Sequence, residues 1–261
     1  MARNLVYYGG GYLYVSTDWH GDYSLFQEWI EKVNEHIKRK KPSLARALIL
    51  GDITNPKKDE DVLTNGDIEI INAIERNTSF PINFLMGNHE RGLNILANLK
   101  KEGHDIQRYL TKFNALTRIK PDYLGKLEHL PTSATTENGI ILTHAGLPAI
   151  GRGIEYLFEP EEEDIDRITE GADEDFDPQK IQIKLNELGI KYSISGHTPL
   201  ARFIPECQKS GMVAINNRRI IFTSNDGYSP GRKTGLCINL QKDYQNLVDE
   251  LKADGDITYL D

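Results

Sequence analysis

The stretch LMGNHERG places an amide, an imidazole, a carboxylate and a guanidinium in succession, at Asn88, His89, Glu90 and Arg91. Such side chains can ligate metal ions, transfer protons or bind a phosphate group. A polar turn at the protein surface would explain the same residues. The two interpretations differ in what they expect elsewhere, because a site needs matching residues from other parts of the chain.

Further polar clusters follow short apolar runs in the same way. The runs are 12–16, 47–50, 82–86, 140–142, 192–195 and 220–223. The side chains that follow them are, in order, Asp18 with His20, Asp52, Asn88 with His89, His144, His197, and the triplet Asn225, Asp226 and Gly227. A lone aspartate or histidine at such a place is ordinary, but four of the seven histidines lie at strand ends beside glycine. The other three, His36, His104 and His129, are expected at the surface.

The apolar runs are typical of buried strands, since they are short, rich in Ile, Leu and Tyr, and bounded by Gly or Pro. A helix is predicted between the first two, with Ser24 as N-cap, apolar residues at helical spacing over 25–37 and basic residues 38–41 in its last turn. Strands alternating with helices predict a layered α/β fold. Ligands of such folds gather at the carboxyl ends of strands, where all these clusters lie.

Mixed carboxylate, amide and imidazole ligands suit divalent manganese, iron, zinc, cobalt or nickel. Six candidate ligands exceed the needs of one tetrahedral site. They suit two ions roughly 3.5–4 Å apart that share a bridging carboxylate.

The motifs Asp-x-His-Gly, Gly-Asp, Gly-Asn-His-Glu, His-Ala-Gly and Gly-His-Thr, in this order, resemble the calcineurin-like metallophosphoesterase superfamily. Gly-Asn-His-Glu with His-Ala-Gly resembles its phosphoprotein phosphatase branch, which includes bacterial and phage Ser/Thr phosphatases and symmetrical diadenosine tetraphosphatases. The resemblance spans residues 12–235. It implies a four-layer α/β/β/α sandwich, formed by a single domain over 1–261, with a dinuclear metal site at the carboxyl ends of the strands.

The resemblance also implies residue roles and cofactors. Two divalent ions, manganese first among the candidates, would be bound: one by Asp18 and His20, the other by Asn88, His144 and His197, with Asp52 bridging. A metal-bridging hydroxide would attack phosphorus in line, and His89 would protonate the leaving oxygen. Glu90 is expected to hydrogen-bond nearby backbone.

Two departures from the family pattern stand out. Thr17 occupies the glycine position of the first motif, and Gly-Asp-x-x-Asp-Arg-Gly becomes the segment 51–57, GDITNPK. Asn55 therefore replaces the aspartate that orients the general acid, and Pro56 replaces the arginine that clamps phosphate. The candidates for substrate binding are Arg91, Lys57, Lys58 and Tyr228, with Arg152 and Arg202 as further cations. Substrate preference is accordingly expected to differ from that of ordinary phosphoprotein phosphatases.

Composition excludes several other classes. A net charge of −8 and a pI near 5.5 disfavour long nucleic acids as partners. The two cysteines, Cys207 and Cys237, are too few and too ordinarily spaced to predict a disulfide framework or a zinc site. The N-terminal residues resemble neither a signal peptide nor a membrane span, so a cytoplasmic location is expected.

Two segments fall outside the motifs. The region 91–130 is predicted to be mostly helical and to cap the site. The tract 159–178 has eleven acidic residues in twenty and is expected to be an inserted, solvated helix and loop. No internal repeat or flexible linker divides the chain.

Three functions remain open at this stage. The first is a Ser/Thr-type phosphatase acting on a phosphorylated protein or a small phosphorylated molecule. The second is a hydrolase of dinucleoside polyphosphates or other nucleotides. The third, a metal-binding scaffold without activity, is disfavoured because each expected ligand position keeps a competent residue. The sequence does not indicate an oligomeric state.

Overall fold

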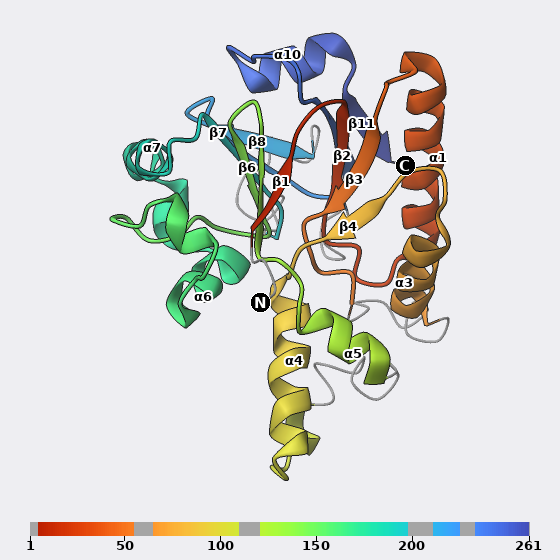
Figure 1. The fold of residues 1–261 in the computed structure, drawn as a ribbon, viewed down its shortest axis with the longest axis vertical. Coiled ribbons are helices and arrows are strands. Elements are labelled where there is room, and N and C mark those ends of the chain that lie inside the picture. The colour runs from red at the N-terminus through yellow and green to blue at the C-terminus, as the bar shows by residue number, and fades with distance from the viewer. Residues whose placement is uncertain (1–4, 55–64, 110–120, 198–210, 225–232, 261) are drawn as a thin grey trace.

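Two mixed β-sheets stacked on each other form the centre of the molecule (Figure 1). The computed structural model describes residues 5–54, 65–109, 121–197, 211–224 and 233–260. The five-stranded sheet has the order β11-β10-β2-β3-β4, and the six-stranded sheet has the order β1-β5-β6-β7-β9-β8. The strands are β1 Leu5–Tyr8, β2 Tyr12–Ser16, β3 Ala45–Ile49, β4 Ile82–Phe84, β5 Ser133–Thr136, β6 Ile140–Thr143, β7 Tyr192–Ser195, β8 Met212–Ile215, β9 Arg219–Phe222, β10 Lys233–Asn239 and β11 Ile257–Leu260.

Alternating side chains of the strands divide the core into layers. In β2, Leu13 and Val15 point into the apolar core between the sheets, whereas Tyr14 belongs to the core on the outer face of the five-stranded sheet. Since successive side chains point to opposite faces, one strand serves both cores. Each sheet is therefore buried on both faces, as the continuous apolar runs predict.

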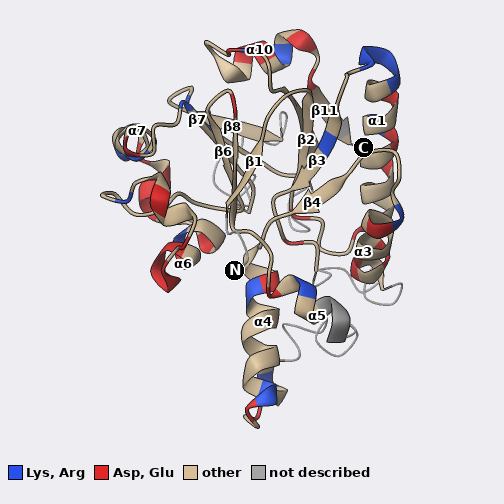
Figure 2. Ribbon diagram, in the orientation of Figure 1, with Lys and Arg blue, Asp and Glu red and all other residues tan. Residues whose placement is uncertain are grey.

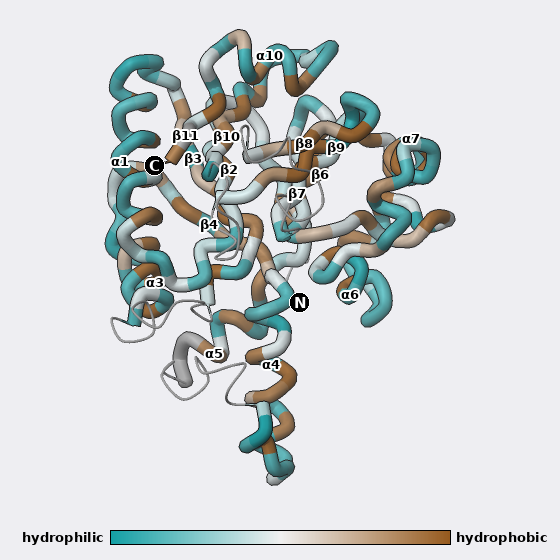
Figure 3. Tube along the Cα trace, turned by 180° about the vertical axis from the view of Figure 1, so that it is seen from behind, coloured by the Kyte–Doolittle hydropathy of each residue, from teal (hydrophilic) through white to brown (hydrophobic). Residues whose placement is uncertain are grey.

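Helices cover the two outer faces. On one side α1 (Tyr23–Lys40) and α3 (Gly66–Arg76) pack on the five-stranded sheet, with Trp29 among the buried residues. On the other side α6 (Glu162–Glu170) and α7 (Pro178–Glu187) pack on the six-stranded sheet through Ile168 and Ile181. Figure 3 shows apolar segments inside and polar ones along the outer helices. The predicted α/β/β/α sandwich is confirmed. No helix within the described ranges is long and apolar enough to cross a lipid bilayer.

Helix α1 begins two residues earlier than the sequence predicts. Asp22 is its N-cap, and the Asp22 carboxylate accepts a hydrogen bond from the Leu25 amide at 3.1 Å. Ser24 instead donates its hydroxyl to Asp22 at 3.0 Å, so the prediction of Ser24 as N-cap is wrong. An ionised carboxylate competes better than a hydroxyl for the exposed amides of a first turn. The basic last turn is confirmed.

The region 91–130 is helical over most of its described part. It contains α4 (Asn88–Lys101), a short 3-10 turn (Gln107–Tyr109) and α5 (Pro121–Leu127), which project from the sandwich in Figure 1. Leu93, Leu96, Ile106 and Leu127 form a separate small apolar cluster between these elements. That this region caps the site stays a prediction.

The acidic tract is only partly solvated. It forms α6 and the 3-10 turn Asp173–Phe176, and Figure 2 shows acidic residues along α6. Two of its acids, Asp164 and Asp175, are each 1% exposed. The Asp175 carboxylate accepts hydrogen bonds from the Ala172 amide and from the buried Lys184 ammonium, which fixes the tract to α7. The expectation of a fully solvated tract is wrong at these two residues.

Of the three histidines expected at the surface, one is not there. His104 and His129 are exposed, but His36 is 7% exposed. Its position on the inner side of α1, three residues after the buried Val33 and beside Tyr14, turns it toward the sheet. Polar residues flanking His36 in the sequence belong to the outer side of the same helix.

Candidate metal centre

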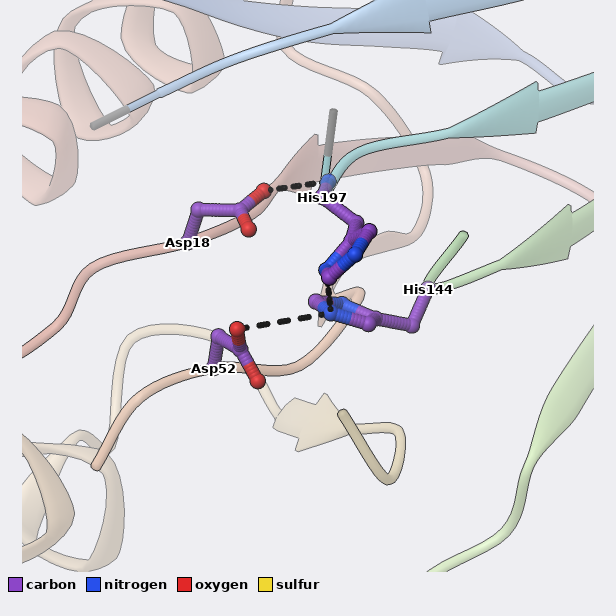
Figure 4. A group of neighbouring side chains, drawn as sticks. All are labelled: Asp18, Asp52, His144 and His197. Atoms are coloured by element: carbon purple, nitrogen blue, oxygen red, sulfur yellow. Dashed lines mark hydrogen bonds and ion pairs between the residues drawn. The ribbon is translucent and has the colours of Figure 1, made fainter. Parts of the chain in front are cut away.

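Seven of the predicted site residues come together where the two sheets present the carboxyl ends of their parallel strands. Asp18 and His20 follow β2, Asp52 follows β3, and Asn88 and His89 begin α4 just after β4. His144 follows β6 and His197 follows β7 of the other sheet. Figure 4 shows Asp18, Asp52, His144 and His197 facing one another from four separate segments. The site therefore straddles both sheets.

The loops that present these residues have an uncommon backbone conformation. Asp18, His20, Asp52 and His197 have φ angles of 57°, 44°, 54° and 67°. Positive φ is rare for residues other than glycine, and it persists only where surrounding structure enforces it. Four of the predicted ligands thus lie on strained backbone.

Hydrogen bonds between the loops hold the strained backbone in place. The Asp18 amide donates to the Gly51 carbonyl at 3.1 Å, and the His20 amide donates to the Asp52 carbonyl at 2.8 Å. Across the gap between the sheets, the His197 amide donates to the Asp18 carboxylate at 2.9 Å. Thr17, the departure from the family's glycine, donates its hydroxyl to the same carboxylate at 2.6 Å. The Asp18 side chain is thereby oriented on two sides.

Close packing of backbones explains the glycines of the motifs. A Cβ atom on Gly51 would lie 2.6 Å from Gly87 and 2.9 Å from the His144 ring, and Gly51 has φ of 119°. A Cβ on Gly87 would meet the Asp52 carboxylate. Only glycine at both positions lets the β3 and β4 loops approach closely enough to place Asp52 and Asn88 together.

Asp52 lies at the centre of the cluster. Its Oδ2 atom is 3.4 Å from His144 Nε2, 3.7 Å from His20 Nε2 and 3.8 Å from His89 Nε2. The ligand atoms of Asp18, Asp52, His144 and His197 lie within 4.8 Å of one another, as do those of His20, Asp52 and His89. Asp52 is common to both groups, as a carboxylate between two ions would be.

Glu90 holds the backbone on both sides of Asp52 through hydrogen bonds. Its buried carboxylate accepts hydrogen bonds from the amides of Asp52 (2.8 Å), Thr54 (3.0 Å) and Gly87 (3.1 Å), and from the Thr54 hydroxyl (2.8 Å). The expectation that Glu90 binds nearby backbone is confirmed. Burial raises the pKa of Glu90, and the Asp52 carboxylate adds to the rise. Glu90 thus ties the β3 loop to the start of α4.

The tautomer of His144 follows from one contact. His144 Nδ1 lies 3.0 Å from the Leu50 carbonyl oxygen, which can only accept, so Nδ1 carries a proton. Nε2 of a neutral His144 therefore directs its lone pair at Asp52 and at His197 Nδ1, 3.1 Å away. A histidine held in this way by a backbone carbonyl is the usual arrangement of a metal ligand.

The charges of the cluster call for a cation. Burial lowers the pKa of His144, but the nearby Asp52 carboxylate outweighs it and raises the pKa to about 9. Burial raises the pKa of Asp18 to about 7, and the charge of Asp52 contributes. Burial opposes ionisation of Asp52 too, yet His144 and His89 hold its pKa well below the usual range. In the absence of metal, protons take the positions that cations would fill.

The orientation of the Asn88 side-chain amide indicates whether the residues present suit a metal ion. Its side-chain oxygen faces only acceptors, whereas a hydrogen-bonded arrangement requires the amide to turn over so that nitrogen donates to Asp52 at 2.9 Å and 3.1 Å. An amide oxygen, two imidazole nitrogens and two carboxylates aimed at one point are a coherent set of metal ligands. The residues present therefore fit divalent ions.

The candidate substrate-binding residues are less well placed. Arg91, 14% exposed in its side chain, forms ion pairs with Glu162 and Asp166 of the acidic tract. Arg152 pairs with Glu161, at 2.6 Å, and with Asp164. The remaining candidates lie outside the described residues: Asn55, Lys57, Lys58, Arg202 and Tyr228, together with Pro56 and the triplet 225–227.

One supporting residue carries no sequence signal. The Ser224 hydroxyl accepts a hydrogen bond from the Thr17 amide at 3.0 Å and donates to the Thr234 carbonyl at 2.8 Å. Ser224 lies 207 positions from Thr17, so only the fold reveals that it anchors the first ligand loop.

Solved structures with the same architecture are phosphatases of several kinds. A protein serine/threonine phosphatase from Saccharomyces cerevisiae with similarity to human phosphatase PP5 is 13% identical, with a TM-score of 0.60, covering 94% of this chain and 82% of that one. A putative diadenosine tetraphosphatase is 17% identical, with a TM-score of 0.59 and coverage of 90% and 94%. A cold-active protein tyrosine phosphatase is 13% identical, with a TM-score of 0.52 and coverage of 90% and 75%.

At such identities these structures establish the fold alone. No curated protein matches the chain significantly. Residues 12–201, which contain every predicted metal ligand, match the calcineurin-like phosphoesterase family. The chain therefore belongs to the calcineurin-like phosphoesterases, a family of metal-dependent phosphoric ester hydrolases.

Proposed function

We propose that the protein is a phosphate monoesterase of the Ser/Thr protein phosphatase type that works with two divalent ions, manganese first among the candidates. The observation that carries the proposal is the position of Asp52, whose one carboxylate oxygen has three imidazoles within 3.8 Å. Asp18 and His20 would hold one ion, Asn88, His144 and His197 would hold the other, and Asp52 would contribute to both. When bound, the ions supply Lewis-acid stabilisation of the phosphoryl oxygens and activate water.

His89 is assigned the role of general acid. It is 6% exposed, and its ring packs edge-on against His20 with centroids 4.9 Å apart. His20 and His89 lie at almost the same distance from Asp52 Oδ2, so distance alone does not separate ligand from acid. The resemblance of the Gly-Asn-His-Glu motif supports the role of acid for His89, whose amide donates to Asp52 Oδ1 at 3.0 Å. A protonated His89 can deliver its proton to the departing ester oxygen. Asn55 is proposed to orient the ring.

Phosphate recognition is assigned to cations near the start of α4. Arg91 is one residue beyond Glu90, and its partners Glu162 and Asp166 are 84% and 54% exposed, so their hold on the guanidinium is weak. A phosphate dianion offers the same bidentate acceptor geometry with more charge and can displace them. Lys57, Lys58 and Tyr228 are the other proposed contacts.

A nucleotide hydrolase is the alternative function. It is supported by the putative diadenosine tetraphosphatase, 94% of whose length is covered by this chain. That neighbour matches the size of this chain as well as the site-bearing sandwich. Its reaction would use the same metal ligands and His89, with a nucleotide in place of an alcohol as the leaving group.

The deciding experiment compares two substrates under one condition. Manganese-dependent phosphate release from a phosphoserine or phosphothreonine peptide is measured beside cleavage of diadenosine tetraphosphate. The Asp52→Asn and His89→Ala variants are the controls. Faster peptide turnover that both variants lose supports the protein phosphatase, and faster dinucleotide turnover supports the alternative. Metal binding without turnover of either substrate would contradict both proposals.

A further inference from the structure

A second group of ligand-bearing side chains lies beside β2. His36 of α1, Cys237 of β10 and Asp256, which precedes β11, offer ligand atoms within 4.8 Å of one another. Their exposed fractions are 7%, 1% and 2%. The His36 ring packs against Tyr12 and Tyr14, the first and third residues of β2, whereas the predicted ligands Asp18 and His20 follow the carboxyl end of that strand. The group is therefore separate from the candidate metal centre.

Two buried atoms of this group lack hydrogen bonds. Within the described part of the chain, His36 Nε2 and Asp256 Oδ1 have no hydrogen-bond partner, although they lie 3.4 Å from each other. Buried polar atoms are almost always satisfied, so an unsatisfied pair facing each other requires an explanation. A bound cation between them would satisfy both.

The nitrogen on the opposite edge of the His36 ring, Nδ1, has the supporting hydrogen-bond partner that a metal-ligating histidine usually has. His36 Nδ1 lies 3.0 Å from the Tyr14 hydroxyl. When Nδ1–H donates to Tyr14, the lone pair of Nε2 faces Asp256, which is the arrangement of a ligating histidine with a supporting hydrogen bond. The Cys237 sulfur is 3.8 Å from Nδ1, and the three residues offer ligand atoms that lie within 4.8 Å of one another.

The chemistry and charge of the group select a borderline metal. We propose that His36, Cys237 and Asp256 bind a zinc ion at a site distinct from the candidate metal centre. Zinc–ligand bonds of about 2.0–2.3 Å imply ligand-to-ligand distances of roughly 3.3–3.6 Å in a tetrahedron, and the Nε2–Oδ1 distance is 3.4 Å. A thiolate, a carboxylate and a neutral imidazole compensate the two charges of zinc. A neutral complex is one that a buried position tolerates.

Lys40 occupies the approach to this site. Its ammonium lies 3.7 Å from Asp256 Oδ1, and its side chain is 32% exposed, so it connects the buried group to solvent. Zinc would displace this ammonium. Burial raises the pKa of the Cys237 thiol, so the sulfur is protonated until a metal replaces that proton. The bound ion would connect α1, β10 and the start of β11.

Cobalt binding provides a test, because one of its absorption bands appears only when a cysteine sulfur is a ligand. Chelator-treated protein is titrated with Co²⁺, and the thiolate-to-cobalt charge-transfer absorption in the near ultraviolet is followed. None of the predicted ligands of the candidate metal centre is a cysteine, so cobalt there does not give this band. The expected result is a band that zinc removes, that Cys207→Ser and Asp52→Asn keep, and that Cys237→Ser loses.

Either of two results would overturn the site. The wild-type protein could show no charge-transfer band, or the band could disappear with Cys207→Ser and persist with Cys237→Ser. Should Cys237→Ser fail to fold, His36→Gln and Asp256→Asn replace it. Their far-ultraviolet circular dichroism checks the fold, and a band undiminished in both variants would equally refute the assignment.

Discussion

The two ligand clusters of this protein contact different parts of β2 and are built in different ways. In the candidate metal centre, Asp18, His20, Asp52 and His197 lie on turns with positive φ. In the second cluster, His36 is inside a helix, Cys237 is inside a strand, and neither they nor Asp256 have positive φ. The second group is fully buried, and the first is buried except at Asn88 and His197, which are half-buried.

The difference shows what backbone strain achieves. Loops at strand ends can turn several ligands toward one point, at a cost of about 1–3 kcal/mol for each strained residue. Regular elements place side chains only where their periodicity allows, so they bring few ligands together. The first arrangement suits two ions and a substrate, and the second suits one ion that stabilises the structure.

The largest contrast is expected between two aspartates. Asp52→Asn should lower manganese-dependent phosphate release about ten-thousandfold, because metal-ion stabilisation contributes several kcal/mol at about 1.4 kcal/mol per factor of ten. Asp256→Asn should leave the rate within about twofold, since its cluster contacts β2 at Tyr14, four residues before Asp18, and shares no residue with the candidate metal centre. Equal losses in initial rates would show that the two clusters are functionally coupled.

His89→Ala should lower kcat about a hundredfold to a thousandfold, the usual contribution of a general acid. The loss should shrink with a p-nitrophenyl phosphate ester, whose leaving group needs little protonation. Metal content, measured by mass spectrometry, should stay at the wild-type value. Loss of one metal in this variant would instead make His89 a ligand.

Glu90→Ala should destabilise the fold by about 3 kcal/mol or more, because four buried donors lose their acceptor and each costs about 1–3 kcal/mol. Urea unfolding of the metal-free protein measures the change. Glu90→Gln, which keeps one acceptor oxygen, should lose less. Similar losses in both variants would show that the charge of Glu90, rather than its acceptors, stabilises the loop.

Metal affinity at the candidate centre should rise with pH. In the metal-free protein the pKa of His144 is raised to about 9 and that of Asp18 to about 7. A metal must displace these protons, so it binds more weakly as pH falls through 9 and then 7, by about tenfold per pH unit for each displaced proton. Calorimetric titration with Mn²⁺ between pH 6 and 8.5 measures this. A flat profile would contradict the proton–metal exchange.

A small effect on substrate binding is expected at Arg91. Replacing its partners with Glu162→Gln and Asp166→Asn should lower KM for phosphopeptide by at most about fivefold, because exposed ion pairs contribute about 1 kcal/mol or less. The matched control removes two charges elsewhere in the tract, through Glu159→Gln and Asp173→Asn. An equal change in the control would assign the effect to net charge rather than to Arg91.

The sequence predicted the strands better than the helix ends. The limits of β2 and β7 are those of the apolar runs 12–16 and 192–195, because buried strands are continuous apolar segments. The N-cap of α1 was misplaced, since Asp22 and Ser24 are both competent caps and only the fold decides between them. Strands β1, β5, β8, β10 and β11 carry weaker patterns and were not predicted.

The sequence by itself predicted which residues meet at the candidate metal centre, because each lies just after the end of a strand, in an order of motifs that resembles one fold family. Only the tertiary structure decided which residues from distant parts of the sequence contact one another. It placed Ser224 behind Thr17, the acidic tract on Arg91, and His36 beside Cys237 and Asp256. Local patterns encode the strands and turns that position a side chain, whereas contacts across 200 residues follow from how the sheets and helices pack, which no local pattern records.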